Sequence, residues 1–343
     1  MTRHQIRVGL IGLGGMANHH ARLLSEIPEA EITAICDVNA ELLRTVGDKL
    51  RVARRYQDYA SIVQDSNVDC IVSVVPNKFH AEILDLCIQY GKPCMTEKPF
   101  TVDFAEAELL KEKYEKSPIP CMVGFSYRYV ASFRYAKHLI EQGELGDIRH
   151  ISANYLQQWG AEMFDTPYSW RFSKTMSGSG ALGDLGAHMI DAARYFAGEF
   201  AYVSAVMKTF VKERRLPDSE QMRTVDVDDF AAFVAGFENG AAGVFTTSRN
   251  AIGFGNHLEV TLFGTKATIQ VNCEHPKTVR RWGKRSAEVD SNVETLNVPE
   301  RFELNQLQDF LNMIRGEGTK ELPDFRDGYE NQKVLDMLIR SSG

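Results

Sequence analysis

Short apolar runs alternate with amphipathic segments along the first part of the chain. The apolar run 6–11 predicts a β-strand, and the amphipathic stretch that ends near Ile27 predicts a helix. A glycine-rich turn, G-L-G-G-M-A at 12–17, lies between them, and a second apolar run at 32–36 predicts a strand that ends in Asp37. This order of strand, tight turn, helix and strand predicts the first unit of a parallel α/β sheet.

The same alternation continues to about residue 125. Strands and helices are predicted in turn at 71–75, 79–90, 93–96, 103–116 and 121–124. The strands are short and continuously apolar, as parallel strands buried on both faces are. We therefore expect an α/β fold that begins with a doubly wound Rossmann domain over residues 1–125.

Beyond residue 125 the pattern changes to a succession of strands. The helices that we expect lie at 132–141, 183–197, 302–315 and 328–340, and the strands at 148–157, 202–210, 229–237, 241–248, 257–263 and 268–271. Asn239-Gly240 between two of the strands predicts a hairpin. Strands that follow one another without helices predict a large, mostly antiparallel sheet in an α+β domain over 126–343. Part of the C-terminal helical segment is expected to pack against the first domain.

One or two helices cannot cover both faces of such a broad sheet. We therefore expect an open-faced sheet and a homodimer or homotetramer formed through the open face.

Composition and charge limit the classes of partner and compartment. The chain of 343 residues has 44% hydrophobic and 25% charged residues, an ordinary balance for two globular domains. A net charge of -7 and the lack of a basic tract argue against nucleic acid as a partner. Six cysteines without a C-x-x-C motif, no apolar run of membrane-spanning length and no export signal before the first strand predict a cytoplasmic protein without a membrane partner.

The glycine-rich turn has the features of a seat for a dinucleotide. Its first glycine allows the bend, its second lets the backbone approach a pyrophosphate, and the N-terminus of the following helix attracts anions. Asp37 stands twenty positions after Ala17, where such a fold places the acid that holds the ribose hydroxyls. Because no arginine follows Asp37 closely, the sequence favours NAD over NADP. A plain structural turn and a solvated acid at a strand end are the alternative interpretations.

Two further segments carry groups that could do chemistry. Asp184, His188 and Asp191 share one stripe of the helix predicted at 183–197, and Gly186 inside it indicates close packing, since glycine costs about 1 kcal/mol there relative to alanine. Lys98 follows a predicted parallel strand, at the edge where open α/β sheets bind ligands. The alternatives are a structural His188 and a surface ion pair between Lys98 and its neighbour Glu97. The histidines show no spacing typical of a metal site, so no metal is expected.

Four motifs in this order resemble the Gfo/Idh/MocA oxidoreductase family nearly from end to end. They are G-L-G-G-M-A at 12–17, E-K-P at 97–99, F-S-Y-R at 125–128, and S-W-R followed by S-G-S-G-A-L-G-D-L-G-A-H-M-I-D within 169–191. The resemblance implies a nicotinamide-binding domain, then an open-sheet domain, and the oxidation of a ring hydroxyl on a sugar or cyclitol.

The resemblance also implies a set of site residues. Lys98, Asp184 and His188 would be catalytic, with His188 as general base and Lys98 stabilising the oxygen. The implied cofactor contacts are Gly12, Gly14, Gly15, Met16, Asp37, Val38, Pro76, Asn77, His80, Glu97, Lys98, Arg128, Trp170 and Arg171. The expected substrate contacts are Lys98, Tyr127, Tyr155, Trp159, Asp184 and His188.

The sequence therefore predicts an NAD-dependent dehydrogenase that oxidises a secondary ring hydroxyl of a monosaccharide, anhydrosugar or inositol. Two alternatives stay open at this point. One is an enzyme that uses tightly bound NAD to assist elimination or glycoside cleavage, and the other is a non-catalytic NAD-sensing regulator.

Overall fold

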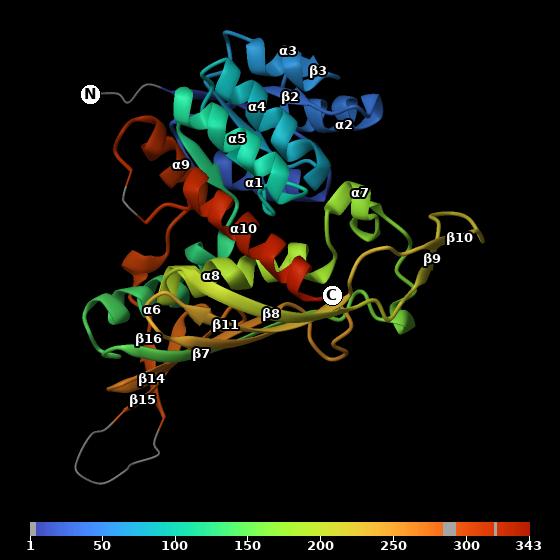
Figure 1. Cartoon of the computed structure of the whole chain (residues 1–343). Helices are drawn as coiled ribbons and strands as arrows, with labels where there is room; N and C mark the ends of the chain where they lie inside the picture. Colours follow the sequence, from blue (N-terminus) through green and yellow to red (C-terminus); the bar gives the residue numbers. More distant parts are fainter. Residues whose placement is uncertain (1–4, 284–292, 319–320) are drawn as a thin grey trace. The chain divides into compact units, whose positions relative to one another are not determined.

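A computed structural model describes residues 5–283, 293–318 and 321–343, whose elements are drawn in Figure 1. The chain forms two compact units. The first is Met1–Gly124 with Asn305–Glu330, and the second is Phe125–Leu304 with Asn331–Gly343. The division after residue 124 lies next to the expected one, whereas residues 305–330 group with the first unit and not with the second. The expectation that no export signal precedes the first strand rests on residues 1–4, which lie outside the described residues.

The first unit is built on a six-stranded parallel sheet with the order β3-β2-β1-β4-β5-β6. Its strands are β1 (Ile6–Ile11), β2 (Ala30–Cys36), β3 (Arg54–Tyr56), β4 (Cys70–Ser73), β5 (Cys94–Thr96) and β6 (Cys121–Val123). Its helices include α1 (Gly15–Ser25), α2 (Ala40–Leu50), α3 (Tyr59–Gln64), η1 (Asn77–Phe79), α4 (His80–Gln89), α5 (Phe104–Lys116) and α9 (Gln306–Ile314). The strand order reverses between β1 and β4, which confirms the doubly wound Rossmann arrangement.

Residues from the end of the chain complete the core of this unit. Leu307, Phe310 and Leu311 of α9 are fully buried in one apolar cluster with residues of β1 and β2. Farther on, Phe325 stacks on Tyr114 of α5 with ring centroids 3.9 Å apart. Burial of these apolar side chains explains why the segment groups with the first unit although it follows the second unit in sequence.

The second unit contains an eight-stranded sheet with the order β16-β15-β14-β13-β7-β12-β11-β8. Its strands are β7 (Ile148–Leu156), β8 (Phe200–Lys208), β11 (Phe230–Phe237), β12 (Ala242–Ser248), β13 (His257–Gly264), β14 (Ala267–Asn272), β15 (Thr278–Gly283) and β16 (Glu294–Asn297). All neighbours pair antiparallel except β7 and β12, which are parallel. The predicted hairpin joins β11 to β12, with Gly240 at φ 86° in the turn.

Several helices and strands were not predicted from the sequence. They include β3, α2 and α3 in the first unit, and β15, β16 and a separate two-stranded hairpin, β9 (Glu213–Arg215) with β10 (Met222–Thr224), in the second. The strands β3, β9, β10 and β16 have only three or four residues, too few to show a clear alternation, whereas α2 has 11 residues and its amphipathic pattern was overlooked.

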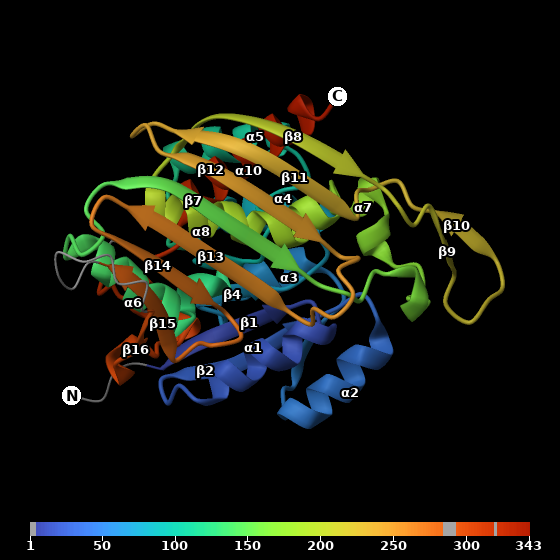
Figure 2. The ribbon, with the colours of Figure 1, turned by 90° about the horizontal axis from the view of Figure 1, so that it is seen from below.

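Helices cover one face of the eight-stranded sheet and leave the other open. Figure 2 shows the strands in front of α6 (Ala131–Glu141) and α8 (Ala187–Ala197). Large side chains of both helices are buried in one core cluster with the inward-facing residues of the strands. On the opposite side, Val206, Val234 and Val244 are each at least half exposed. The open-faced sheet is therefore confirmed.

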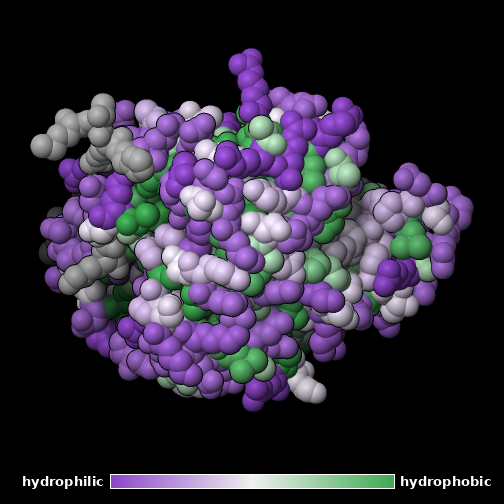
Figure 3. Space-filling model, turned by 90° about the horizontal axis from the view of Figure 1, so that it is seen from above, coloured by the Kyte–Doolittle hydropathy of each residue, from purple (hydrophilic) through white to green (hydrophobic). Residues whose placement is uncertain are grey.

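Three further properties concern the hydropathy of the surface, the state of the cysteines and the length of the helices. Hydrophilic residues predominate on the face drawn in Figure 3, with hydrophobic residues in small separate groups. All six cysteines are free thiols, and five of them are buried. Within the described residues, no helix has the length and apolar character needed to span a bilayer.

Candidate functional site

The glycine-rich turn after β1 has the backbone that a dinucleotide seat requires. Gly12 has φ 89°, and a Cβ built on it would lie 2.9 Å from the carbonyl oxygen of Val74, so only glycine fits. A Cβ on Gly14 or Gly15 would meet nothing within 4 Å. Because α1 begins at Gly15, the first N–H groups of the helix lie at this turn and could donate to an anion.

The structure fixes Asp37 directly beside this turn. One oxygen of its carboxylate accepts a hydrogen bond from the Leu13 backbone N–H at 2.8 Å, and the other accepts from the Asn39 N–H at 2.8 Å. Val38, which follows, is 81% exposed. The carboxylate, the open glycine backbone and the helix N-terminus therefore converge on one side of the sheet edge. These residues fit a dinucleotide with unphosphorylated ribose hydroxyls, and the contacts of Met16 and Val38 with the cofactor stay a prediction.

At the other side of the sheet edge, His80 holds two turns together. Its Nδ1 lies 2.8 Å from the Pro99 carbonyl oxygen and its Nε2 lies 3.0 Å from that of Val75. Burial lowers the pKa of His80, so the ring is neutral and donates to one of these oxygens at a time. The contacts link the turn at Pro76 to the cis Lys98–Pro99 bond. The structure gives His80 this positioning contact, whereas its contact with a cofactor stays a prediction.

Glu97 lies between α1 and β6. Its carboxylate is 3.0 Å from Nε2 of His20, a buried histidine of α1. A Cβ on Gly124 would lie 2.7 Å from the same carboxylate, so Gly124 leaves room for it. The sequence did not assign a role to His20. The sequence feature that could have indicated such a role is the position of His20 on the buried side of an amphipathic helix.

In the second unit, a buried carboxylate caps the helix that carries Asp184 and His188. Asp228 accepts hydrogen bonds from the N–H groups of Gly180 at 2.7 Å and Leu182 at 2.8 Å. A Cβ on Gly180 would lie only 1.6 Å from the backbone oxygen of Asp228. The close packing expected at Gly186 is present but milder, since its Cβ would meet Leu182 Cδ1 at 3.0 Å.

The helix differs from the regular α-helix that was expected. Leu182–Gly186 forms a turn of π-helix, and α8 follows from Ala187. The wider turn changes the angle between Asp184 and the residues after it from that of a regular α-helix. Such turns are frequent at functional sites.

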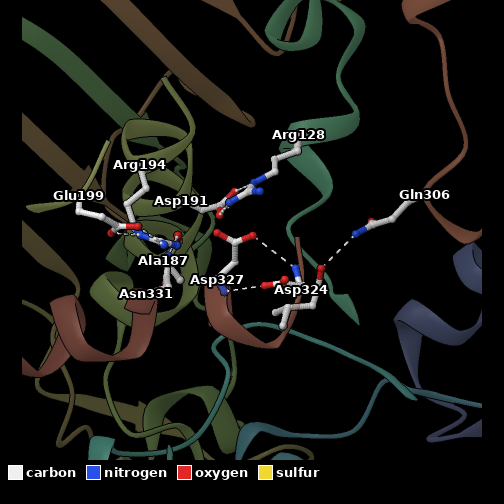
Figure 4. Close-up of polar contacts among 10 residues, drawn as sticks. Arg128, Ala187, Asp191, Arg194, Glu199, Gln306, Asp324, Asp327 and Asn331 are labelled. Carbon is white, nitrogen blue, oxygen red and sulfur yellow. Dashed lines mark hydrogen bonds and ion pairs between the residues drawn. The ribbon is translucent and has the colours of Figure 1, made fainter. Parts of the chain in front are cut away.

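Asp191 of this stripe is structural. Figure 4 shows its carboxylate facing Arg128, whose Nε and Nη2 donate to it at 2.9 and 2.6 Å. Both residues are buried. A guanidinium held in this way satisfies a buried charge. Arg128 therefore has a structural partner in the second unit, and its expected contact with the cofactor stays a prediction.

His188 lies among aromatic and polar side chains. Its ring meets that of Tyr127 edge to face, with centroids 4.7 Å apart, and the ring of Tyr155 lies at 6.2 Å. The two tyrosine hydroxyls are 2.5 Å apart, and the Tyr155 hydroxyl donates to Asn256 at 2.8 Å. Burial raises the pKa of Tyr127 to about 12 and raises that of Tyr155 as well, so both hydroxyls keep their protons at neutral pH.

The polar network extends from these tyrosines to Trp159. Gln157 donates to Asn256 at 2.7 Å, and the Trp159 indole N–H donates to Gln157 at 2.5 Å. Flat aromatic rings beside hydroxyl and amide groups suit a polyhydroxylated ring. Asn256 and Gln157 were not predicted, because single polar residues at strand ends give no pattern.

Asp184 has a cationic partner that the sequence did not reveal. Arg249, directly after β12, donates from Nη2 to Asp184 Oδ2 at 3.0 Å. Arg171 stacks its guanidinium on the neighbouring Trp170 at 4.4 Å. No group of three or more potential metal ligands occurs in the part of the chain that the structure describes.

Both units match known protein families in sequence. Residues 6–125 match the model of the oxidoreductase family with an NAD-binding Rossmann fold, and residues 133–270 match the Gfo/Idh/MocA C-terminal domain. Levoglucosan dehydrogenase of Pseudarthrobacter phenanthrenivorans is 30% identical over 98% of this chain and 96% of its own length. Myo-inositol 2-dehydrogenase of Thermotoga maritima is 30% identical over 77% and 74%.

A solved structure shows the same likeness in three dimensions. The complex of levoglucosan dehydrogenase with NADH superposes with a TM-score of 0.92 at 30% identity, covering 99% of this chain and 97% of the other. The family models together cover more than half of the chain. The chain therefore belongs to the Gfo/Idh/MocA family of NAD-dependent oxidoreductases.

Proposed function

We propose that the protein is an NAD-dependent dehydrogenase that oxidises a secondary ring hydroxyl of a monosaccharide, anhydrosugar or inositol. The observation that carries the proposal is the placement of His188 beside the hydroxyl and amide network of Tyr127, Tyr155 and Asn256. A general base next to groups that bind hydroxyls is what removal of a proton from a sugar alcohol needs. The names of the two relatives support the same substrate class.

The first unit would hold the cofactor. The open glycine turn would receive the pyrophosphate, and the Asp37 carboxylate, fixed by the Leu13 N–H, would accept hydrogen bonds from the ribose hydroxyls. Bound NAD would supply the hydride-accepting nicotinamide. Asp37 would also repel a 2′-phosphate, which supports NAD over NADP.

His188 and Lys98 would act on the hydroxyl that is oxidised. A secondary alcohol that loses hydride also loses its hydroxyl proton, and neutral His188 would accept it. The Lys98 ammonium would donate a hydrogen bond to the same oxygen and stabilise the negative charge that develops there. Asp184, held by Arg249, would accept a hydrogen bond from a neighbouring hydroxyl of the substrate. Trp159 would contact the ring.

A substrate panel tests this proposal. The purified protein is given NAD with levoglucosan, myo-inositol, other inositols and aldoses, and NADH formation is followed together with the oxidised product. We expect NADH and ketone in equal amounts from at least one of them. NADH binding without product formation from any polyol would favour the NAD-sensing regulator, and product that has lost water or an aglycone without net NADH would favour assisted elimination.

We also propose that two copies associate through the open face of the eight-stranded sheet. Val234 and Val244 are directly paired across β11 and β12 on that face, and both are at least half exposed. Apolar side chains paired on a broad open sheet support burial against a second sheet. Light scattering on Val234→Glu with Val244→Glu should give a smaller assembly than the wild type. Leu109→Glu, at an exposed position of α5, is the matched control.

A further inference from the structure

Arg249 is the largest side chain in the molecule that is fully buried within the described residues, and only 1% of it is exposed. Its backbone is fixed on both sides. Its N–H donates to the Asp229 carbonyl, and its own carbonyl accepts from the Gly160 N–H, both at 2.9 Å. A Cβ on Gly160 would lie 2.7 Å from the Arg249 Cβ, so the loop that begins at residue 157 packs directly on this arginine.

The guanidinium of Arg249 joins two parts of the candidate site. Nη2 donates to Asp184 at 3.0 Å, and Nη1 donates to the Arg171 carbonyl oxygen at 3.3 Å. Its central carbon lies 5.0 Å from the centre of the Trp159 ring and 6.0 Å from that of Phe172. One side chain thus contacts the proposed catalytic carboxylate and an aromatic residue proposed to face the substrate.

Stability alone does not account for this arrangement. Moving a charged guanidinium out of water is costly, and a buried ion pair repays that cost only when the remaining donors are satisfied. Among the described residues, Nε of Arg249 has no hydrogen-bond partner although it is buried. An apolar side chain of similar volume would fill the space beside Trp159 and Phe172 without this penalty.

We propose that Arg249 is a positioning residue for the dehydrogenase reaction. It holds Asp184 as an oriented carboxylate and fixes Trp159 at a set distance from that carboxylate. This inference rests on the proposed role of Asp184 in substrate binding and catalysis. Arg249 does not touch the reacting atoms, so its effect on turnover passes through Asp184.

A double-mutant cycle separates positioning from mere structural support. The cycle compares the wild type, Arg249→Gln, Asp184→Asn and the double variant, with kcat/KM for the best substrate of the panel and the NADH dissociation constant as readouts. We expect Arg249→Gln to lower kcat/KM by about tenfold or more and the NADH affinity to stay within about twofold. In the Asp184→Asn background, the same substitution should change kcat/KM by less than about twofold.

The pH profile is a second readout. Asp184 interacts electrostatically with Arg249, Tyr127 and Tyr155, and Arg249 also acts on the buried Asp228. Loss of a cation raises the pKa of a neighbouring carboxyl. Arg249→Gln should therefore move the acidic limb of kcat/KM to higher pH, and Arg249→Lys should restore part of that shift.

Arg214 provides the matched control. It is also a buried arginine, stacks on Phe172 at 4.2 Å and donates to the carbonyl oxygens of Gly160 and Thr166, but the described structure shows no contact between it and Asp184. If Arg214→Gln lowers kcat/KM, this loss should add to the loss caused by Asp184→Asn. The acidic limb of the pH profile of kcat/KM should stay at the same pH in Arg214→Gln. If Arg249→Gln does not fold, the cycle is run with Arg249→Lys.

The outcomes distinguish this inference from the proposed function. If Asp184→Asn keeps full activity, the proposed role of Asp184 is wrong and the inference falls with it. If Asp184→Asn loses activity and Arg249→Gln lowers kcat/KM by the same factor in the wild type and in Asp184→Asn, the dehydrogenase proposal stands. The positioning role of Arg249 is then overturned.

Discussion

His20 Nε2 lies 3.0 Å from Glu97 Oε1, so a buried histidine of the helix that follows the glycine turn contacts the residue before Lys98. This contact joins two segments that are 77 residues apart, because His20 lies on α1 and Glu97 directly follows β5. The position of the Glu97-Lys98-Pro99 segment therefore depends on α1.

Replacing His20 by alanine should loosen this segment. The Glu97 carboxylate, whose side chain is 16% exposed, would lose its contact with His20, and a hydrogen bond to a charged group contributes about 1.5–3 kcal/mol. We expect a lower free energy of unfolding and a weaker affinity for NADH, measured by urea denaturation and by fluorescence titration. His19→Ala changes the exposed neighbour on the same helix and serves as the control. If His20→Ala and His19→Ala have the same free energy of unfolding and the same affinity for NADH, the structural role given to His20 is wrong.

Removal of Arg128 should destabilise the second unit. Asp191 would remain as a buried charge without its bidentate partner, a loss of about 3–5 kcal/mol. Denaturant unfolding of Arg128→Met tests this, and Arg128→Met with Asp191→Leu should recover most of the loss because no charge stays buried. Failure of the double variant to recover any stability would mean that Arg128 contributes in another way.

Gly180→Ala should be among the most damaging single substitutions. The new methyl group would overlap the Asp228 carbonyl, and the cap on the helix of Asp184 would have to move. Overpacking of this kind costs about 1–3 kcal/mol or more. Thermal unfolding of Gly180→Ala is compared with that of Gly283→Ala, where the methyl group meets its nearest atom at 3.5 Å. A melting temperature equal to that of the control would contradict the packing described.

Alkaline pH should destabilise the protein above the ordinary pKa of tyrosine. Burial raises the pKa values of Tyr59, Tyr114 and Tyr127 from 10.0 to about 12. A group whose pKa is raised by folding gives stability that is complete below the unfolded pKa and is lost as the pH rises through the folded one. The urea midpoint should therefore fall between about pH 10 and about pH 12. Tyr127→Phe should make that fall smaller, and an unchanged fall would show that this phenol does not contribute.

Sequence patterns predicted the sheets better than the contacts of single side chains. Apolar runs placed β1, β4 and β11 within a few residues of their observed positions, because burial on one or both faces imposes a period that can be read locally. The same reasoning placed α10 three residues late, since its observed range is Phe325–Ser341. Its N-terminal turn packs against Phe100, a contact that depends on distant residues.

The candidate site was predictable only in part for the same reason. Asp184 and His188 share a helical period, and Asp37 follows a strand, so both features were visible in the sequence. The partners of these residues come from separate strands and loops. Arg249 lies 65 residues after Asp184, and a π-helical turn that no periodicity announces changes the side chains that the helix presents.

The central claim is that Lys98 and His188 act on one substrate hydroxyl. A crystal structure of the protein with NAD and the best substrate of the panel tests it most directly. The account predicts that Lys98 Nζ and a ring nitrogen of His188 each lie within about 3.2 Å of the oxygen on the carbon that faces the nicotinamide. A substrate whose reacting oxygen contacts neither group, or only one of them, would contradict it.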